Sequence, residues 1–395
     1  MKTLLLALAL SLVAGELSAQ RGATLATECP YCEGQSARME ASGLVSHGPF
    51  DFGKGGSVVV EDAVPAAEIH WAESAHFRLG YGAGPVKISS RELKSLRLEL
   101  ERLQLKLPGV KPKTKVLDPW LRVHLLIQRF EETYDQFQAV MQVAPRDFPK
   151  AGRKWMLGTP YWGEGPYLGQ QEKFEVLILS NPNQQVDYLS AEYGLQIKHT
   201  QLWNVIERGA LTLVTNLRQD SLQSDLKLHA HLVFNLIHNF LNGFKFYSYD
   251  TPLWIQEGLG HYFERQLTTR YNSFSRSEGG TPLARSSKKW LLDVQKLIKS
   301  KEAPRLAELM ALKAYADFTL EHHYTTWSMV AFLVETKPKA FAELNKLVHG
   351  RKAEDGTGAG GNMDDVFREA FKTSVGLSYG AFDREWAEWA LLQEP

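Results

Sequence analysis

Cysteine is scarce in this chain. Its 395 residues include two, Cys29 and Cys32, which excludes a framework of several disulfides and a zinc ribbon built on two cysteine pairs. An excess of charge of one sign is also missing, because 45 Lys and Arg balance 45 Asp and Glu. We therefore expect no nucleic-acid partner. Beyond the first residues, no apolar run reaches the length of a transmembrane helix, so we expect no membrane insertion.

The beginning of the chain has the pattern of a secretory signal peptide. Lys2 gives the positive start, and an apolar run from Leu4 to Ala14 is too short to span a membrane. Leu17-Ser18-Ala19 suits cleavage by signal peptidase. We therefore predict a signal peptide over residues 1–19 and a mature chain that is exported to the periplasm or secreted.

The sequence Cys29-Pro30-Tyr31-Cys32 admits three interpretations. We favour a local disulfide that ties down an exported N-terminal segment. A metal site comes second, with His47 and one of His70 or His76 as further ligands. Redox catalysis, which the glutaredoxin-like sequence suggests, comes third, because no strand pattern precedes Cys29 as it does in redox dithiols.

Apolar periodicity predicts a sheet followed by mostly helical structure. Predicted strands span 76–80, 174–179 and 211–214, with a further pairing near 194–199. Predicted helices span 91–107, 119–143 with Asp118 as the cap, 290–300, 305–312, 323–335, 339–349, 364–372 and 379–392.

Two further helices are legible at the centre of the chain. The first, from about residue 226, carries a stripe of apolar residues at helical spacing, and Pro252 opens the second. His238 lies on the first helix and Glu257 on the second, with eighteen residues between them. Glu257 stands in the sequence Trp254-Ile255-Gln256-Glu257-Gly258.

This central segment resembles the gluzincin metallopeptidases, the peptidase MA group that includes thermolysin and the aminopeptidases. Their zinc site is H-E-x-x-H on one helix and a Glu on the next, which in the aminopeptidases stands in a W-x-x-E-G context. His238 matches the second histidine of that motif, and Glu257 matches the glutamate. The resemblance implies that the two side chains meet at a cleft.

The resemblance fails at two positions. Phe234 stands where the family has its first zinc histidine, and Asn235 stands where it has the catalytic glutamate. Catalytic zinc takes three protein ligands and one open position for water, and Phe234 supplies no ligand. Asn235 has no basic carboxylate to take a proton from metal-bound water. The resemblance therefore implies a scaffold that has lost the standard peptidase chemistry.

Other residues offer a rearranged site. His261 lies four residues after Glu257 on the same helix face, so His238, Glu257 and His261 form a candidate zinc ligand set. The alternative is a histidine that is hydrogen-bonded beside the old site. The family places a tyrosine on a later helix to stabilise the oxyanion, and Tyr324 is a candidate for that role, with aromatic packing as the alternative. Tyr324 and Asn235 are the candidate catalytic residues, and His231 or Tyr324 would handle the proton.

The predicted fold class is α+β, with a small mixed sheet, gluzincin-type active-site helices and a mainly helical C-terminal subdomain. The expected ranges are 1–19 for the signal peptide, 20–65 for an irregular Cys-containing segment, 66–219 for an α/β part, 220–268 for the central helices and 285–395 for the helical subdomain.

Three functions remain open. The first is a non-catalytic pseudopeptidase that binds an extended peptide or a protein in its cleft, where an edge strand offers a place for a peptide to add. The second is a zinc metallohydrolase with the rearranged ligands His238, Glu257 and His261. The third is an exported thiol-disulfide protein that acts through Cys29 and Cys32. The expected cofactor is accordingly zinc or none.

Overall fold

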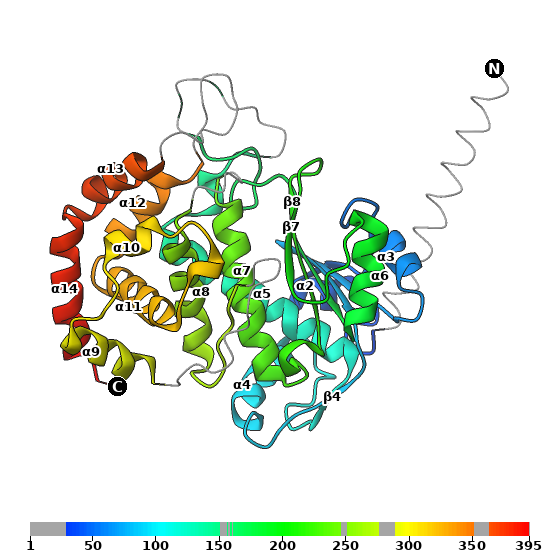
Figure 1. Ribbon diagram of the computed structural model, residues 1–395. Coiled ribbons are helices and arrows are strands. Elements are labelled where there is room, and N and C mark those ends of the chain that lie inside the picture. Colours follow the sequence, from blue (N-terminus) through cyan, green and yellow to red (C-terminus); the bar gives the residue numbers. More distant parts are fainter. Residues whose placement is uncertain are drawn as a thin grey trace. The chain divides into compact units, whose positions relative to one another are not determined.

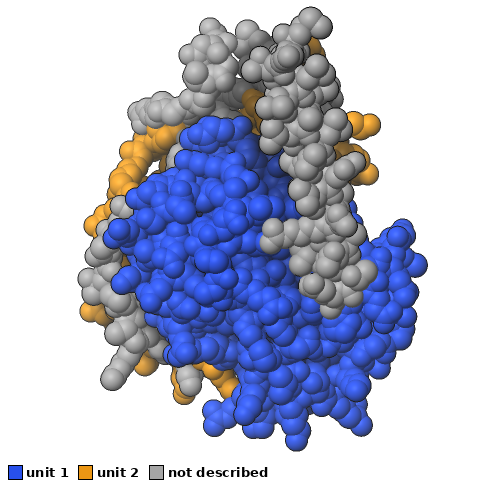
Figure 2. All heavy atoms as spheres, turned by 90° about the vertical axis from the view of Figure 1, so that its right-hand side faces the viewer, with its two compact units in different colours: residues 1–133, 172–228 blue, residues 134–171, 229–395 orange. Residues whose placement is uncertain are grey.

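The structure of the chain is a computed structural model. It describes residues 29–150, 156, 159, 161–245, 251–275, 289–350 and 363–394. The predicted signal peptide lies outside these residues. The chain forms two compact units, and each combines two segments: unit 1 comprises residues 1–133 and 172–228, and unit 2 comprises residues 134–171 and 229–395 (Figure 2). The units divide the chain differently from the expected ranges, because residues 134–171 group with the helical part.

Unit 1 is built on a six-stranded mixed sheet in the order β1-β2-β3-β6-β8-β7. Strands β3, β6 and β8 are parallel, whereas β1, β2 and β7 each pair antiparallel with a neighbour. The strands are β1 Leu44–Ser46, β2 His70–Ser74, β3 Phe77–Gly82, β6 Phe174–Leu179, β7 Gln201–Val205 and β8 Ala210–Asn216. All six residues of β6 are buried, as expected for a central parallel strand covered on both faces.

The predictions for the sheet are confirmed at β3, β6 and β8 and wrong at the fourth strand. The pairing expected near 194–199 lies later, at β7. Helix α6 (Pro182–Tyr193) is the reason, because it ends at Gly194, whose left-handed backbone (φ 71°) caps the helix before the chain enters the strand.

The segment 20–65 is less irregular than expected. Its described part contains α2 (Ser36–Ala41), β1 and α3 (Ser57–Ala63). The helices are only six and seven residues long, so their periodicity is too short to stand out among the glycines around them.

Helices cover both faces of the sheet (Figure 1). On one face, α3 and α6 enclose an apolar core in which Phe52 and Trp71 lie beside Leu177 of β6. On the other face lies α5 (Pro119–Met141), whose Phe130 packs on Phe77 of β3 with 5.3 Å between the ring centroids. Asp118 caps the start of α5, as the sequence predicted, because its carboxylate accepts a hydrogen bond from the Leu121 amide at 3.0 Å.

A buried ion network holds α5 to its neighbours in unit 1. The Arg129 guanidinium donates to Asp225 at 2.8 Å and to Glu99 of α4 (Leu93–Lys106) at 2.6 Å. Arg129 and Asp225 each have 3% of their side chains exposed. Strands β4 (Val86–Lys87) and β5 (Val116–Leu117) form a separate, short antiparallel pair.

Unit 2 is mainly helical, so the predicted α+β class is confirmed. Its helices are α7 Asp225–Gly243, whose first turn belongs to unit 1, α8 Leu253–Leu267, α9 Trp290–Ser300, α10 Leu306–Ala311, α11 Leu320–Thr336, α12 Pro338–Val348, α13 Met363–Val375 and α14 Tyr379–Leu392. The predicted helices agree with these bounds to within three residues. Within the described ranges, no helix is both long and apolar enough to cross a membrane.

Helices α8 and α11 approach closely because α8 carries a glycine at the contact. A Cβ atom on Gly258 would lie 2.6 Å from the Thr326 carbonyl oxygen of α11. Only glycine fits a backbone approach of this kind. The short distance between the two helices brings the polar side chains of α8 within reach of those of α11.

Candidate functional site

Four buried side chains of unit 2 converge between α7, α8 and α11. Glu257 of α8 is at the centre, and its carboxylate oxygens lie 3.8 Å from His238 Nε2, 3.6 Å from His261 Nε2 and 3.2 Å from His323 Nδ1. His261 Nε2 and His323 Nδ1 are 3.1 Å apart. The structure therefore brings together the three residues that the sequence proposed as ligands, and it adds His323.

The Glu257 carboxylate is fully buried and poorly satisfied. Neither oxygen accepts a hydrogen bond of sound geometry from the residues that the structure describes. Burial raises the pKa of this carboxyl, but His323 and His238 outweigh burial and hold the pKa below its ordinary value. A buried anion beside three imidazole rings is a group that a cation would stabilise.

Glu264 fixes the orientation of His261. Its Oε2 lies 3.1 Å from His261 Nδ1, and its Oε1 accepts a hydrogen bond from the Ser273 amide at 2.6 Å. The ring of His261 consequently turns its Nε2 toward Glu257. Metal-binding histidines commonly have a carboxylate on the second ring nitrogen in this way. Burial lowers the pKa of His261 well below its ordinary value, and burial also lowers that of His238, which favours the neutral form of both rings.

Phe234 packs against two of the histidines of this cluster. Its ring centroid lies 4.6 Å from that of His238 and 4.9 Å from that of His261. Gly260 makes room for this arrangement, because a Cβ atom there would lie 2.8 Å from the Phe234 ring and 3.0 Å from His238 Nε2. An apolar ring thus occupies one side of the cluster.

Asn235 is engaged in its own helix. Its Nδ2 donates to the His231 carbonyl at 2.8 Å and lies 3.3 Å from His231 Nε2. His231 Nδ1 lies 3.3 Å from the Ser273 hydroxyl. The two residues form a polar contact with each other, and neither supplies a carboxylate to act as a base.

Tyr324 lies on α11 and contacts Trp290. Its ring packs on Trp290 with 4.9 Å between centroids, so the alternative interpretation, aromatic packing, describes it. Tyr315 lies beside the cluster: its ring centroid is 6.5 Å from that of His238, and its hydroxyl donates to the Gln256 side chain. Burial and the Glu257 charge raise the pKa of Tyr315.

The expected disulfide between Cys29 and Cys32 is absent, because both cysteines are free and buried. Each sulfur faces a histidine instead. Cys29 Sγ lies 3.2 Å from His124 Nε2, and Cys32 Sγ lies 3.1 Å from His47 Nε2. Of the histidines named with His47 in the sequence, His76 contacts Glu131 through its Nδ1 at 2.6 Å. His70 packs on the Trp120 ring, which His47 also contacts.

A pocket of about 570 Å³ opens beside the same helix α8. Arg265 lies in its wall, with its guanidinium carbon 4.1 Å from the Trp290 ring centroid and 5.0 Å from that of Trp327. Tyr262 and Glu335 also line it. An apolar pocket with a few charged groups is the usual form of a ligand site.

Sequence reasoning named neither His323 nor His124 as a ligand. His323 adjoins His322 and lies 66 positions from Glu257, so no local motif identifies it. His124 lies inside α5, 95 positions after Cys29, among residues whose apolar periodicity is the dominant signal. Only the packing of helices that are distant in sequence reveals either residue.

Comparison with known families finds one model that matches part of unit 2. The family, described as "Protein of unknown function (DUF1570)", matches residues 233–353. The matched range contains Phe234, His238, Glu257, His261 and His323. A comparison with curated proteins finds no match.

Proposed function

We propose that the central helices belong to a gluzincin-like module that no longer hydrolyses peptide bonds and instead binds an extended peptide or a protein partner outside the cytoplasm. The observation that carries this proposal is the position of Phe234, whose ring packs 4.6 Å from His238 and 4.9 Å from His261. A hydrolytic zinc site needs a ligand at that corner, a position open to water and a base beside it.

None of these three requirements is met by the residues at the site. Phe234 has no metal-binding atom, and the Asn235 amide is directed to the His231 carbonyl. Glu257 and His261 are fully buried, and His238 is 1% exposed, so a scissile bond has no route to them through the described side chains. These features support loss of the chemistry together with retention of the scaffold.

Two features support a binding role. The pocket beside α8 is lined by Trp327 and by Arg265, whose guanidinium lies over the Trp290 and Trp327 rings, and such a wall suits an acidic side chain of a partner. In unit 1, β7 is an edge strand of the sheet, and an extended peptide can add to such an edge. The predicted signal peptide places the partner in the periplasm or outside the cell.

The proposal is tested with the mature chain purified without a metal-binding tag. We expect no turnover of a mixture of fluorogenic peptides with added zinc. We expect binding to members of a peptide array, weakened by Trp327→Ala and unchanged by Trp389→Ala, which removes a partly exposed tryptophan outside the pocket. Zinc-dependent turnover that Glu257→Gln abolishes, or equal binding by both tryptophan variants, would contradict the proposal.

A second candidate function is favoured by the unsatisfied carboxylate of Glu257. One oxygen of Glu257 and one nitrogen each of His261 and His323 lie within 4.8 Å of one another, and this ligand set suits zinc. Bound zinc would supply Lewis acidity, which is the basis of a metallohydrolase with rearranged ligands. The ligands differ from the expected set, because His323 takes the place of His238.

Metal analysis decides this second candidate. It predicts an equivalent of zinc that Glu257→Gln and His323→Ala each remove, whereas Glu335→Gln, a change in a less buried glutamate of α11, leaves it in place. Retention of that equivalent in both site variants would rule the candidate out.

A further inference from the structure

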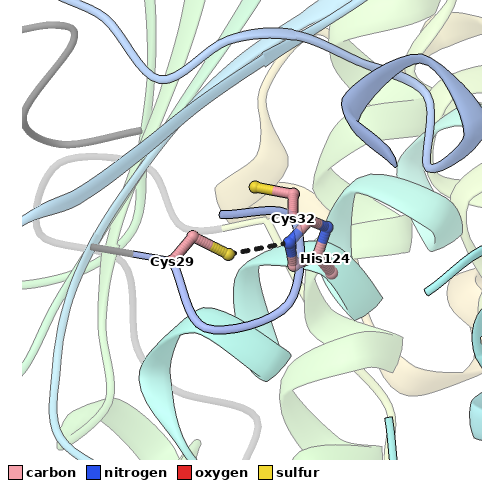
Figure 3. A group of neighbouring side chains, drawn as sticks. All are labelled: Cys29, Cys32 and His124. Atoms are coloured by element: carbon pink, nitrogen blue, oxygen red, sulfur yellow. Dashed lines mark hydrogen bonds between the residues drawn. The ribbon is translucent and has the colours of Figure 1, made fainter. Parts of the chain in front are cut away.

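We infer that Cys29, Cys32, His47 and His124 form a structural metal site for zinc in unit 1, separate from the cluster around Glu257. Figure 3 shows the Cys29, Cys32 and His124 side chains directed toward a common region, with Cys29 and His124 in contact. The inference is independent of the function proposed above, because it concerns other residues and the other unit.

The distances among Cys29, Cys32 and His124 suit one tetrahedral ion, and His47 adjoins this group through Cys32. The sulfur atoms of Cys29 and Cys32 and one nitrogen of His124 lie within 4.8 Å of one another, and all three residues are buried. Cys32 Sγ also lies 3.1 Å from His47 Nε2. With Zn–S of about 2.3 Å and Zn–N of about 2.0 Å, the sulfur and nitrogen ligands of a tetrahedral ion are about 3.5 Å apart. The observed sulfur–nitrogen separations of 3.1 and 3.2 Å are close to this value.

The tautomer of His47 follows from its second contact. Its Nδ1 lies 2.8 Å from the Trp71 carbonyl oxygen. Because a carbonyl oxygen only accepts, Nδ1 must carry the hydrogen and donate. Nε2 is then left with its lone pair directed at the Cys32 side of the cluster. A backbone carbonyl that orients a ring in this way is a frequent outer contact of zinc-bound histidine.

The loop that follows Cys32 has an unusual backbone. Glu33 and Gly34 both have positive φ, 51° and 66°, and a non-glycine residue in this region is uncommon. The turn is closed by the Glu33 amide, which donates to the Cys29 carbonyl, and by the Gln35 amide, which donates to the Cys32 carbonyl, both at 2.9 Å. This turn folds the chain back so that both cysteines face the same side.

The chemistry of the ligands favours zinc over a thiol function. Two thiolates and two imidazoles are a ligand set of tetrahedral zinc, and four protein ligands leave no open position, which is the mark of a structural site. Both cysteines have 0% of their surface exposed, whereas thiol exchange requires an accessible sulfur. The ion would join the segment before α2, the end of β1 and helix α5, which are far apart in sequence.

The test uses the mature chain without a metal-binding tag. We expect one equivalent of zinc that Cys32→Ser and His124→Ala each remove, in addition to any ion held at Glu257. The cobalt-substituted protein should show a thiolate-to-cobalt charge-transfer band, which Glu257→Gln leaves intact because that residue supplies no sulfur. The band is measured on the protein with its natural sequence, in which cobalt has replaced zinc. The test therefore still decides the question if the Cys32→Ser variant fails to fold.

A matched pair of histidine variants sharpens the test. His47 and His70 both pack on the Trp120 ring, at 4.9 and 4.8 Å between centroids, and both are buried. His47→Ala should lower zinc retention during dialysis against a chelator, and His70→Ala should not. Equal retention in the two variants, no charge-transfer band, or denatured protein that contains a Cys29–Cys32 disulfide and no metal would overturn the inference.

Discussion

Phe234 and His238 lie one helical turn apart on α7, with 4.6 Å between their ring centroids and 39° between their planes. The Phe234 ring therefore packs directly on the His238 ring and leaves no void beside it. Gly260 of α8 lies against both rings. We conclude that Phe234, His238 and Gly260 pack together as one unit. A change of side-chain volume at one of these positions should therefore alter the packing at the other two.

Gly260→Ala should destabilise the protein. The new methyl group would lie 2.8 Å from the Phe234 ring and 3.0 Å from His238 Nε2, and overpacking of this kind costs about 1–3 kcal/mol. Gly380→Ala on α14 is the matched control, because nothing lies within 4 Å of its added Cβ. That change should be neutral or stabilise by up to about 1 kcal/mol. Urea denaturation of the two variants measures the difference.

The packing unit also predicts a rescue. In a Phe234→Ala background the methyl group of Gly260→Ala gains space, so the double variant should be more stable than the sum of the single changes predicts. A coupling free energy of about 1 kcal/mol or more is the expected size for residues in contact. Additive free energies of unfolding would show that the two positions do not share their packing.

Restoring the two departures from the gluzincin pattern should create a zinc site. With Phe234→His and Asn235→Glu together, an imidazole takes the corner beside His238, whose Nε2 already lies 3.8 Å from Glu257. Three ligands then share one site, as catalytic zinc requires. Zinc content and peptide turnover of the double variant are the measurements, with Phe234→Leu and Asn235→Glu as the control pair that adds the carboxylate without the ligand. A folded double variant with no additional zinc would refute the alignment of these positions with the motif.

The sequence was sufficient to predict the elements that have strong periodicity. The central strand 174–179 and the helix 379–392 agree with the structure residue for residue, because an unbroken apolar run and a capped amphipathic pattern are local signals. The contact of His238 with Glu257 was also predicted from the sequence. The prediction rested on the number of residues between these two positions on consecutive helices.

The sequence could not predict which residues from distant segments come together at a site, because tertiary contacts determine this. His323 reaches Glu257 because α11 approaches α8 at Gly258, and no pattern in a single chain specifies which helices become neighbours. The cysteine pair shows the same limit. A spacing of three residues suits a disulfide or a metal site equally, and the neighbours that distinguish them, His47 and His124, come from the folding of unit 1.

Two charged residues of unit 1, one in a buried ion pair and one in an exposed ion pair, should contribute unequally to the free energy of unfolding. Asp225→Asn should destabilise by about 3–5 kcal/mol, because it removes the carboxylate that faces two buried guanidinium groups, those of Arg129 and Arg122. Arg129 would then keep only Glu99. Glu132→Gln removes a partner of Arg102, and both side chains of that pair are about half exposed, at 51% and 44%. Its effect should be within about 1 kcal/mol. Chemical denaturation at neutral pH tests the contrast, which equal losses would contradict.

Replacement of the buried Lys245 by methionine should raise the free energy of unfolding by an amount that depends on pH. Burial lowers its pKa to about 8 from 10.5, although its Nζ donates to the Lys346 carbonyl at 2.7 Å and lies 5.4 Å from the Trp162 ring centroid. Below pH 8 the lysine is charged in both states, and the difference in pKa corresponds to about 3 kcal/mol of destabilisation. Lys245→Met removes this destabilisation. The same change also removes one hydrogen bond, whose loss costs about 1 kcal/mol. We therefore expect a net gain of about 2 kcal/mol at pH 7.

The gain from Lys245→Met should disappear as pH rises. Between pH 8 and 10.5 the unfolded chain binds the proton that the folded chain has released, so the free energy of unfolding of the parent protein rises with pH through this window. The variant lacks this rise, and the two proteins should converge near pH 10. Lys339→Met, at an exposed position of α12, controls for the loss of a surface charge. A stability difference that stays constant from pH 7 to pH 10 would show that Lys245 keeps its ordinary pKa in the folded chain.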